Sequence, residues 1–586
     1  MPSRSWSILA CVTLIIQLTV LVAVLLTARG GVLPVVDLAA RVVWQAHRPA
    51  FGARRGVRRW WRERRGKQPA SAGQAPVTHS SDQAPGAEGG ADGPTGSTLA
   101  DPARWGLGRE QCAELPGMLL AFWQSFAACF RTRTRDASHY AYHYLNGLLR
   151  MDGERNFAAI GRATGAGGEN IQHFMSNSPW PFVALIKRLW AQIKTTPQLG
   201  QGAVLLLDES GNEKDGDHSV GAARQYNGRL GKVDMSQVAV CLGYANVVDA
   251  ERPLWTWVDG RLFLPQHWFE PEMAEHREKV GLPEELVFKT KVQLGWELIE
   301  QAFDGGLPFD AVVFDALYGR STWLRDQVHR RGGVYMADVP RSTLVYLERP
   351  DLGVPARQPG APGRTPSRVQ VLGDAEPVPV HTLADDPVTD WQAVRVRPTE
   401  RGRLEVQFAA RRVWTRRDDC PTPVAEWLVI RRESDGTCSY SLSNAPEDTP
   451  LAYLAWLKCQ RYFVERSIQE AKSAVGWDDL RARKYRAWQH HLALVILAVW
   501  FLALTRWQWA IRFARDAQLA AELGLDHLPP LSLANIRMLL QAVMPLPLLS
   551  PQDAVALVAR QLLNRARSRR SRLNKMTRTH QALAPP

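Results

Sequence analysis

Two short apolar runs, each followed by an aspartate, most constrain the fold of this chain. Residues 203–207 precede Asp208, and residues 309–314 precede Asp315. Short apolar runs bounded by polar residues are typical of buried strands. Sheets of α/β proteins carry their chemistry at the carboxyl ends of such strands. We therefore expect an α/β fold that brings both aspartates to one edge of a sheet.

A third acidic residue lies in the stretch RYFVERSIQEAK, residues 461–472. On a helix that turns by about 100° per residue, Arg461, Glu465 and Lys472 fall within roughly 40° of one another, whereas Glu470 points elsewhere. An acid between cations on one helix face is most often a surface ion-pair ladder. The two strand-end aspartates favour a second interpretation, in which three carboxylates converge on one site.

These segments resemble motifs of the DDE transposases of bacterial insertion sequences. DESGNEKDGDHSVGAARQYNGRLGKVDMSQVAV is similar to the family's first-aspartate block, and VVFDALYG followed by LRDQVHRRGGVYMADVP is similar to the second. The family signature Tyr-x2-Arg-x3-Glu-x6-Lys is matched by Arg461, Glu465 and Lys472, with Lys458 at the tyrosine position. The similarity covers roughly residues 101–506.

The resemblance implies a ribonuclease-H-like mixed sheet with flanking helices and a DNA transposase activity. Asp208, Asp315 and Glu465 would be the catalytic metal ligands for two Mg2+ ions, or Mn2+ in their place. Arg461 and Lys472 would position DNA phosphate. One site would nick the transposon ends and then transfer a DNA strand to the target. Double-stranded DNA is the expected partner, and the pairing of two ends implies a homodimer.

Composition agrees with a polyanionic partner. The 586 residues carry a formal charge of +14, and the sequence pI is near 9.6. Such a balance favours nucleic acid or an anionic membrane surface. The seven cysteines form no CxxC pair. Neither a zinc site nor a disulfide framework is therefore indicated, which fits a reducing cytosol.

The first hundred residues have a separate character. Residues 7–28 are uncharged and mostly apolar, which predicts a transmembrane helix within the segment 1–30. The basic residues that follow would leave the body in the cytoplasm, anchored to the inner membrane. The alternative is an upstream fusion or a misassigned start. Residues 31–102 continue as a basic segment and then a Pro, Gly, Ala and Ser-rich tether, which cannot bury a core.

Residues 103–200 show helical apolar spacing and predict an all-α DNA-binding subdomain. Within it, NFAAIGRATGAGGENIQHFM contains two short amphipathic pieces around a Gly turn, which is compatible with a helix-turn-helix. An ordinary helical hairpin fits the same pattern. In the first interpretation the side chains facing base edges are those of Glu169, Asn170, Gln172 and His173.

Residues 201–340 predict the first part of the catalytic core, with three strands, a helix and the strand before Asp315. Residues 341–450 alternate over short runs between Pro, Gly and Asp turns, which predicts a β-rich insertion before Glu465. Three charged loop residues of the core are candidate phosphate contacts, namely Lys214, Arg224 and Lys232. Two tryptophans of the insertion, Trp391 and Trp414, are either base-stacking residues or core residues.

Residues 451–515 complete the predicted core. The uncharged stretch 491–504 is too short to span a bilayer comfortably, so we expect a buried core helix there. Residues 516–586 predict a helical C-terminal region with a basic tail, which would add non-specific phosphate affinity.

Two other functions fit parts of the sequence. One is a catalytically silent DNA-binding protein derived from a transposase, and the other is a membrane-anchored protein whose body binds nucleic acid for regulation. The acids at 208, 315 and 465 favour the enzyme, whereas the first 70 residues alone favour the anchor.

Overall fold

A computed structural model describes residues 99–582, apart from residue 229 and the short segments 250–251, 358–363, 400–401, 418–419, 526–527 and 547–549. The expected transmembrane helix 7–28, the basic segment and the tether lie outside the described residues. Within them, one helix, Tyr485–Arg512, is long and apolar enough to cross a membrane. Since 89% of its most apolar window is buried inside the protein, the expected core helix at 491–504 is confirmed.

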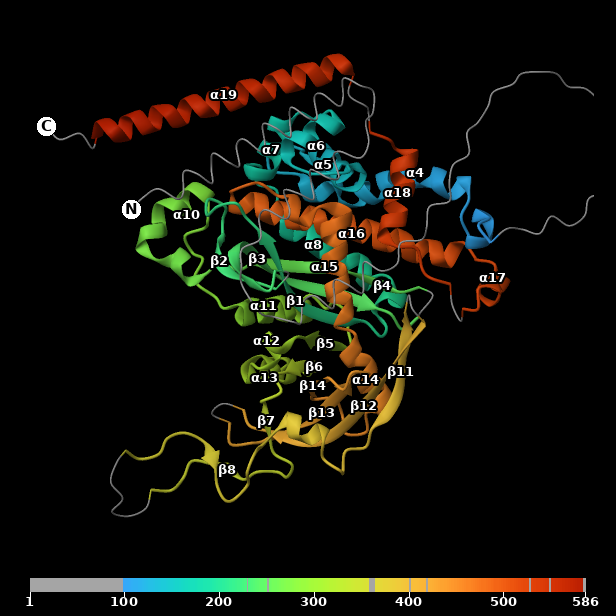
Figure 1. Ribbon diagram of the computed structural model, residues 1–586, viewed down its shortest axis with the longest axis vertical. Coiled ribbons are helices and arrows are strands. Elements are labelled where there is room, and N and C mark those ends of the chain that lie inside the picture. The colour runs from blue at the N-terminus through green and yellow to red at the C-terminus, as the bar shows by residue number, and fades with distance from the viewer. Residues whose placement is uncertain are drawn as a thin grey trace, which may run out of the picture. The chain divides into compact units, whose positions relative to one another are not determined.

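The architecture is mixed α/β, built on a ten-stranded sheet with flanking helices (Figure 1). Its order is β11-β12-β13-β14-β6-β5-β1-β3-β2, and β4 also pairs with β3. The strands are β1 (Val204–Glu213), β2 (Ala223–Asn227), β3 (Lys232–Asn246), β4 (Leu254–Leu262), β5 (Ala311–Phe314), β6 (Val334–Val339), β11 (Gln392–Thr399), β12 (Gly402–Thr415), β13 (Val424–Arg432) and β14 (Cys438–Ser443). Two small two-stranded sheets pair β7 (Leu344–Val345) with β10 (Val378–Pro379) and β8 (Leu352–Gly353) with β9 (Gln370–Val371).

The helices precede, interrupt and follow the strands. They are α4 (Arg109–Phe126), α5 (Ser138–Arg150), α6 (Phe157–Thr164), α7 (Gly168–Ser176), α8 (Phe182–Lys194), α9 (Pro197–Gly200), α10 (Ala274–Val280), α11 (Lys291–Asp304), α12 (Ala316–Gly319), α13 (Thr322–Arg330), α14 (Leu451–Cys459), α15 (Tyr462–Val475), α16 (Tyr485–Arg512), α17 (Ala517–Glu522), α18 (Leu533–Val543) and α19 (Pro551–Ala582).

The central five strands have the directions that a ribonuclease-H-like sheet requires. β3 runs antiparallel to β1 and to β4, whereas β5 runs parallel to both β1 and β6. This arrangement is consistent with the fold expected from the sequence. The parallel strands need crossover connections, which α11 supplies before β5 and α13 supplies before β6.

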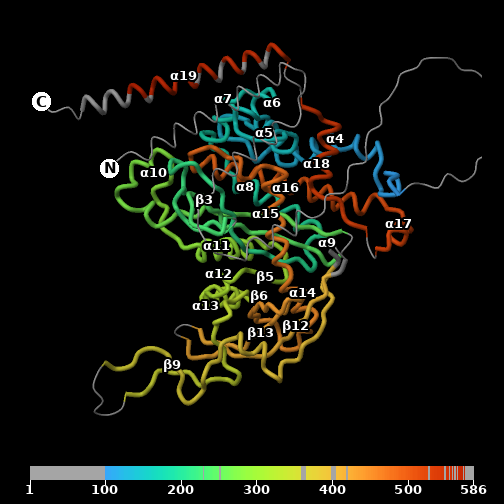
Figure 2. The backbone as a smooth tube through the Cα atoms, in the orientation of Figure 1, coloured from blue at the N-terminus to red at the C-terminus, as the bar shows by residue number. Residues whose placement is uncertain are grey.

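The expected β-rich insertion joins the central sheet directly. β14 pairs antiparallel with β6, and β13, β12 and β11 extend the sheet outward from there. Figure 2 traces how the chain leaves the core after β6 and comes back to it through these strands. A buried cluster fixes the junction: Arg325 of α13 donates to Glu426 of β13 at 2.8 Å, and both side chains are almost fully buried.

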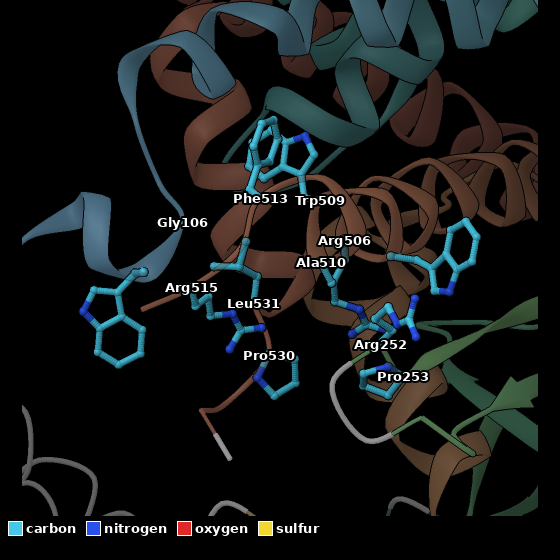
Figure 3. Close-up of a pocket in the computed structure, with 12 residues that line it drawn as sticks. Gly106, Arg252, Pro253, Arg506, Trp509, Ala510, Phe513, Arg515, Pro530 and Leu531 are labelled. Carbon is cyan, nitrogen blue, oxygen red and sulfur yellow. The ribbon is translucent and has the colours of Figure 1, made fainter. Parts of the chain in front are cut away.

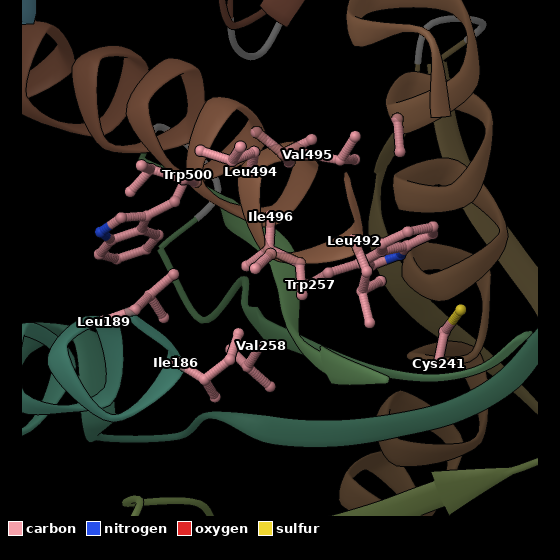
Figure 4. Close-up of a cluster of buried hydrophobic side chains, with 14 of the residues drawn as sticks. Ile186, Leu189, Cys241, Trp257, Val258, Leu492, Leu494, Val495, Ile496 and Trp500 are labelled. Carbon is pink, nitrogen blue, oxygen red and sulfur yellow. The ribbon is translucent and has the colours of Figure 1, made fainter. Parts of the chain in front are cut away.

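The helical segment before β1 shares its core with α16. The Phe122 and Phe501 rings pack 5.2 Å apart, and the Tyr144 hydroxyl bonds His491 Nδ1 at 2.8 Å. Figure 4 shows side chains of α8, β4 and α16 interlocked around Trp257 and Ile496. The continuous apolar surface of α16 therefore finds partners on several sides, which explains why its sequence lacks the amphipathic pattern of a surface helix.

Strand alternation assigns the two faces of the sheet. Val204 and Leu206 pack in one cluster with Val464 of α15, whereas Leu205 and Leu207 belong to the cluster on the other side. α11 lies on that second side, where a Cβ added to its Gly295 would come 2.7 Å from Leu207 Cδ2. Side chains at alternate positions of a strand share a face, so position 208 lies on the α15 side.

Candidate active site

Three aspartates form a row across the parallel strands β1, β5 and β6. Leu207 pairs with Phe314, and Phe314 pairs with Ala337. The next residue along each strand is an aspartate, namely Asp208, Asp315 and Asp338. Equivalent positions on neighbouring parallel strands point to the same face, so all three carboxylates lie on the side of the sheet that α15 covers.

One detail corrects the sequence-based expectation. β1 does not end at Asp208 but continues to Glu213, paired with β3 alone beyond Leu207. Asp208 therefore lies inside a strand, at the point where the parallel pairing with β5 stops. The strand end that the sequence predicted before the second aspartate is present, because β5 ends at Phe314. Asp315 then caps α12, where its Oδ1 accepts the Leu317 backbone N–H at 2.9 Å.

Asp208 and Asp315 are difficult to ionise together. Burial, followed by the charge of Asp315, raises the pKa of Asp208 to about 7. Burial also raises the pKa of Asp315, although the backbone N–H of Tyr318 and the charge of Arg461 oppose that shift. Two partly buried carboxylates that repel each other favour either a shared proton or a cation between them.

Asp338 is the acid that the sequence analysis missed. Its Oδ1 accepts a hydrogen bond from Lys458 Nζ at 2.9 Å, and its Oδ2 lies 3.6 Å from Arg461 Nε. Ser441 also donates to this carboxylate. Burial alone would raise the pKa of Asp338, but Lys458, Ser441 and Arg461 outweigh it and hold that pKa below its ordinary value.

Arg461 links the row to the expected third acid. It lies at the junction between α14 and α15, and its guanidinium pairs with Glu465 one turn later. The charge of the same guanidinium opposes the upward shift in the pKa of both Asp208 and Asp315. The structure thus brings Asp208, Asp315 and Arg461 together. Glu465, with an exposed side chain, joins them through Arg461.

The other charged residues of α15 have different neighbours. Lys472 Nζ donates to the backbone oxygen of Gly211 on β1 at 2.8 Å, three residues beyond Asp208. Glu470 points away, as its helical position predicts, and accepts the Trp255 indole N–H at 2.7 Å. Arg466 also binds Glu470, at 3.1 Å. One face of α15 therefore points toward the aspartate row, and another packs against β4 through the contact between Glu470 and Trp255.

The donor chemistry of the row fits a hard divalent cation at Asp208 and Asp315. Carboxylate oxygens are the ligands that Mg2+ prefers, and a cation would relieve the repulsion that raises both pKa values. The nearby Tyr318 hydroxyl is buried with no hydrogen-bond partner in the described part of the chain. In residues 99–582, outside the gaps, no group of three or more His, Cys, Asp or Glu residues is arranged to hold a metal. The fit therefore applies to the aspartate pair.

The expected helix-turn-helix segment forms α6 and α7 around a Gly165–Gly167 turn. The two helices cross closely, because a Cβ on Gly161 would come 2.4 Å from the Gly168 backbone nitrogen. The four side chains that the sequence analysis assigned to base edges all lie on α7 and are exposed, namely Glu169, Asn170, Gln172 and His173.

Several other candidate contacts are occupied within the protein. Lys214 Nζ donates to the Leu480 backbone oxygen at 2.9 Å, and burial, with Arg481, lowers the pKa of Lys214 to about 8. Lys232 pairs with Asp234, whereas Arg224 is exposed on β2. The tryptophans of the insertion are half-buried under guanidinium groups: Arg432 lies 3.8 Å from the Trp391 ring centre and Arg349 lies 5.6 Å from that of Trp414.

Comparison with known proteins adds an independent observation. Residues 125–403 match the family model described as "DDE superfamily endonuclease". The matched segment contains Asp208, Asp315 and Asp338 but ends before Glu465. The chain is also 27% identical over 190 residues to a curated protein of Microchaete diplosiphon named "Probable transposase for insertion sequence element IS701". That alignment covers 31% of this chain and 45% of the relative's length. Both matches support a nuclease of the transposase type.

Proposed function

We propose that this protein is a DNA transposase that cleaves the ends of a mobile element and joins them to target DNA. The observation that carries the proposal is the Asp208–Asp315 pair, which directly follows the paired residues Leu207 and Phe314 of two parallel strands within the segment that resembles DDE endonucleases. Their raised pKa values support the proposal, because a bound cation would relieve the repulsion between the two carboxylates. The alternative, a catalytically silent and membrane-anchored DNA-binding protein, gives no reason to keep two repelling carboxylates.

Each residue has a role in the proposed site. Asp208 and Asp315 hold the divalent cation, Mg2+ or Mn2+, and Glu465 supplies a third carboxylate once Arg461 turns to a DNA phosphate. The bound metal would activate the attacking water or 3′-hydroxyl and stabilise the leaving oxygen. Lys472 and Arg461 hold the phosphodiester in line with the attack. Because water and then a DNA 3′-oxygen attack phosphorus directly, no covalent protein intermediate is needed.

Binding of the element ends extends beyond the aspartate row. The exposed face of α7 contacts DNA in this proposal, and two copies of the chain pair the two ends as a homodimer. The body acts in the cytoplasm. Residues 7–28, if they span the inner membrane, would tether that body without entering the chemistry.

A nicking assay tests the proposal. The full chain is incubated with supercoiled DNA that carries the inverted repeats flanking its reading frame, with Mg2+ or with EDTA. Nicking should require the metal and should be lost in Asp208→Asn, Asp315→Asn and Glu465→Gln. Asp310→Asn is the matched control, because Asp310 lies at the opposite end of β5 and is exposed. Metal-dependent nicking by Asp208→Asn at the wild-type rate would refute the assignment.

A further inference from the structure

A second charged feature lies away from the aspartate row, where the end of α16 meets the β3–β4 turn. The Arg506 pocket is lined by three arginines and by aromatic side chains (Figure 3). On the β1–β3 ladder, Asp208 pairs with Cys241, whereas Val204, at the start of β1, pairs with Ala245 near the end of β3. The β3–β4 turn therefore lies beyond the start of β1, on the side away from Asp208. The stretch of β1 from Val204 to Asp208 alone spans about 13 Å.

Arg506 is a buried cation with unmet hydrogen-bonding capacity. It is 3% exposed, and its Nε and Nη2 atoms have no hydrogen-bond partner in the described residues. Its guanidinium lies 3.8 Å from the centre of the Trp255 ring. Glu470 is the acid whose field reaches it, yet the Glu470 carboxylate is already bound by Arg466 and Trp255. An uncompensated buried charge is costly, and burial accordingly lowers the pKa of Arg506 to about 10.

The other pocket residues offer donors. Trp509 is 2% exposed, and its indole N–H also has no partner in the described part of the chain. Arg252 is half-exposed at the mouth, where it pairs with Asp249. Figure 3 shows the Arg252 and Arg506 side chains next to each other above Pro253. Among the described residues that line the pocket none is acidic, so the pocket combines positive charge with buried, unpaired N–H groups in its wall.

We propose that the Arg506 pocket binds a phosphate group. Guanidinium groups bind phosphate oxygens in a planar, charge-assisted geometry, and the Trp509 N–H adds a neutral donor. An anion there would compensate the charge of Arg506, and a shift of the lining side chains would let it reach the two unpaired Arg506 nitrogens, which the protein now covers. Phosphate could come from the DNA backbone or from a small phosphorylated molecule. The proposal goes beyond the cleavage site, because the pocket lies at the other end of the sheet.

Binding without metal provides the test, since cleavage cannot occur in EDTA and a failed assignment of the aspartates would not affect the result. The full chain is titrated with inorganic phosphate, followed by thermal melting, and with a fluorescent duplex, followed by anisotropy over a range of salt. The variants are Arg506→Gln, Arg252→Ala and Trp509→Phe. Arg512→Ala is the matched control, because Arg512 is on the same helix but pairs with Glu114 outside the pocket.

Phosphate should raise the melting temperature of the wild type and of Arg512→Ala, but not of the pocket variants. If the source is DNA, Arg506→Gln and Arg252→Ala should also weaken duplex binding about tenfold and lower the salt slope by about one. If DNA binding is unchanged while phosphate stabilisation is lost, a small phosphorylated molecule is the ligand. Trp509→Phe keeps an aromatic side chain and removes only the indole N–H, so it still tests phosphate binding if Arg506→Gln does not fold. Wild-type responses of folded Trp509→Phe and Arg252→Ala to both probes would overturn the proposal.

Discussion

Asp208 and Asp338 occupy equivalent positions on the sheet but have opposite electrostatic environments. Both are half-buried and follow residues at matched register positions in the parallel strands. The pKa of Asp208 is raised to about 7, whereas the pKa of Asp338 lies below its usual range. The difference comes from the neighbours of each carboxylate: Lys458 and Ser441 bind Asp338, whereas Asp208 is repelled by Asp315 more than it is attracted by Arg461. The protein itself compensates the charge of Asp338, whereas the charge of Asp208 is compensated less, which is why we propose a cation there.

The largest expected effect of this difference is on cleavage. Asp208→Asn removes a proposed metal ligand, whose loss would cost several kcal/mol of transition-state stabilisation, so nicking should fall by about a thousandfold. Asp338→Asn leaves the proposed metal ligands in place and acts on cleavage only through the position of Arg461, so the loss of activity should be about tenfold. Initial nicking rates at saturating Mg2+ measure both. Equal losses would mean that the two acids have the same role.

The next effect is on stability. Asp338→Asn leaves the Lys458 ammonium buried without its carboxylate, and breaking a buried pair costs about 3 kcal/mol. The double variant Asp338→Asn with Lys458→Met removes both charges and should recover most of the loss. Denaturant unfolding of the two single variants and the double variant gives the coupling energy. Additive effects would show that the two side chains do not depend on each other.

Stability against pH separates the two aspartates by sign. In EDTA, ionised Asp208 destabilises the folded state, because its folded pKa of about 7 exceeds the unfolded value near 3.8. The contribution of Asp208 to stability, measured as the difference between wild type and Asp208→Asn, should therefore fall as pH rises from 4 to 7. Asp208→Asn should melt higher than wild type at pH 8, by roughly 2–4 °C, and equally near pH 4. Asp338→Asn should melt lower at pH 8, with the deficit shrinking as pH falls below 4.

The sequence predicted that the two aspartates after apolar runs come together at one edge of the sheet, and helical spacing predicted that Arg461 and Glu465 share a face of α15. It missed Asp338 although VYMADVP shows the same pattern, because an acid at a strand end gains meaning only from its register with Asp208 and Asp315. Lys458 stood out as a departure from a signature, but its partner lies 120 positions earlier in the chain. The insertion was expected to be β-rich, but apolar alternation within its strands does not predict that β14 pairs with β6 at the edge of the central sheet.

The smallest expected effect concerns Lys472. Its Nζ donates to the Gly211 oxygen three residues beyond Asp208, and the proposed function makes it a DNA phosphate contact. Lys472→Ala should weaken binding to cleaved ends modestly and lower the slope of log K against log salt by about one. Lys279→Ala serves as the control, since Lys279 pairs with Glu275 on α10. If salt slope and affinity both stay at wild-type values, Lys472 only fastens α15 to β1.

The central claim is that Asp208 and Asp315 together bind a divalent cation. Titration of the full chain with Mn2+, followed by electron paramagnetic resonance of the free ion, measures this binding without any DNA or catalysis. Wild type and Asp310→Asn should bind Mn2+ with the same affinity at pH 8, and Asp208→Asn and Asp315→Asn should each bind at least about tenfold more weakly. Mn2+ binding that is unchanged in both aspartate variants would contradict the account.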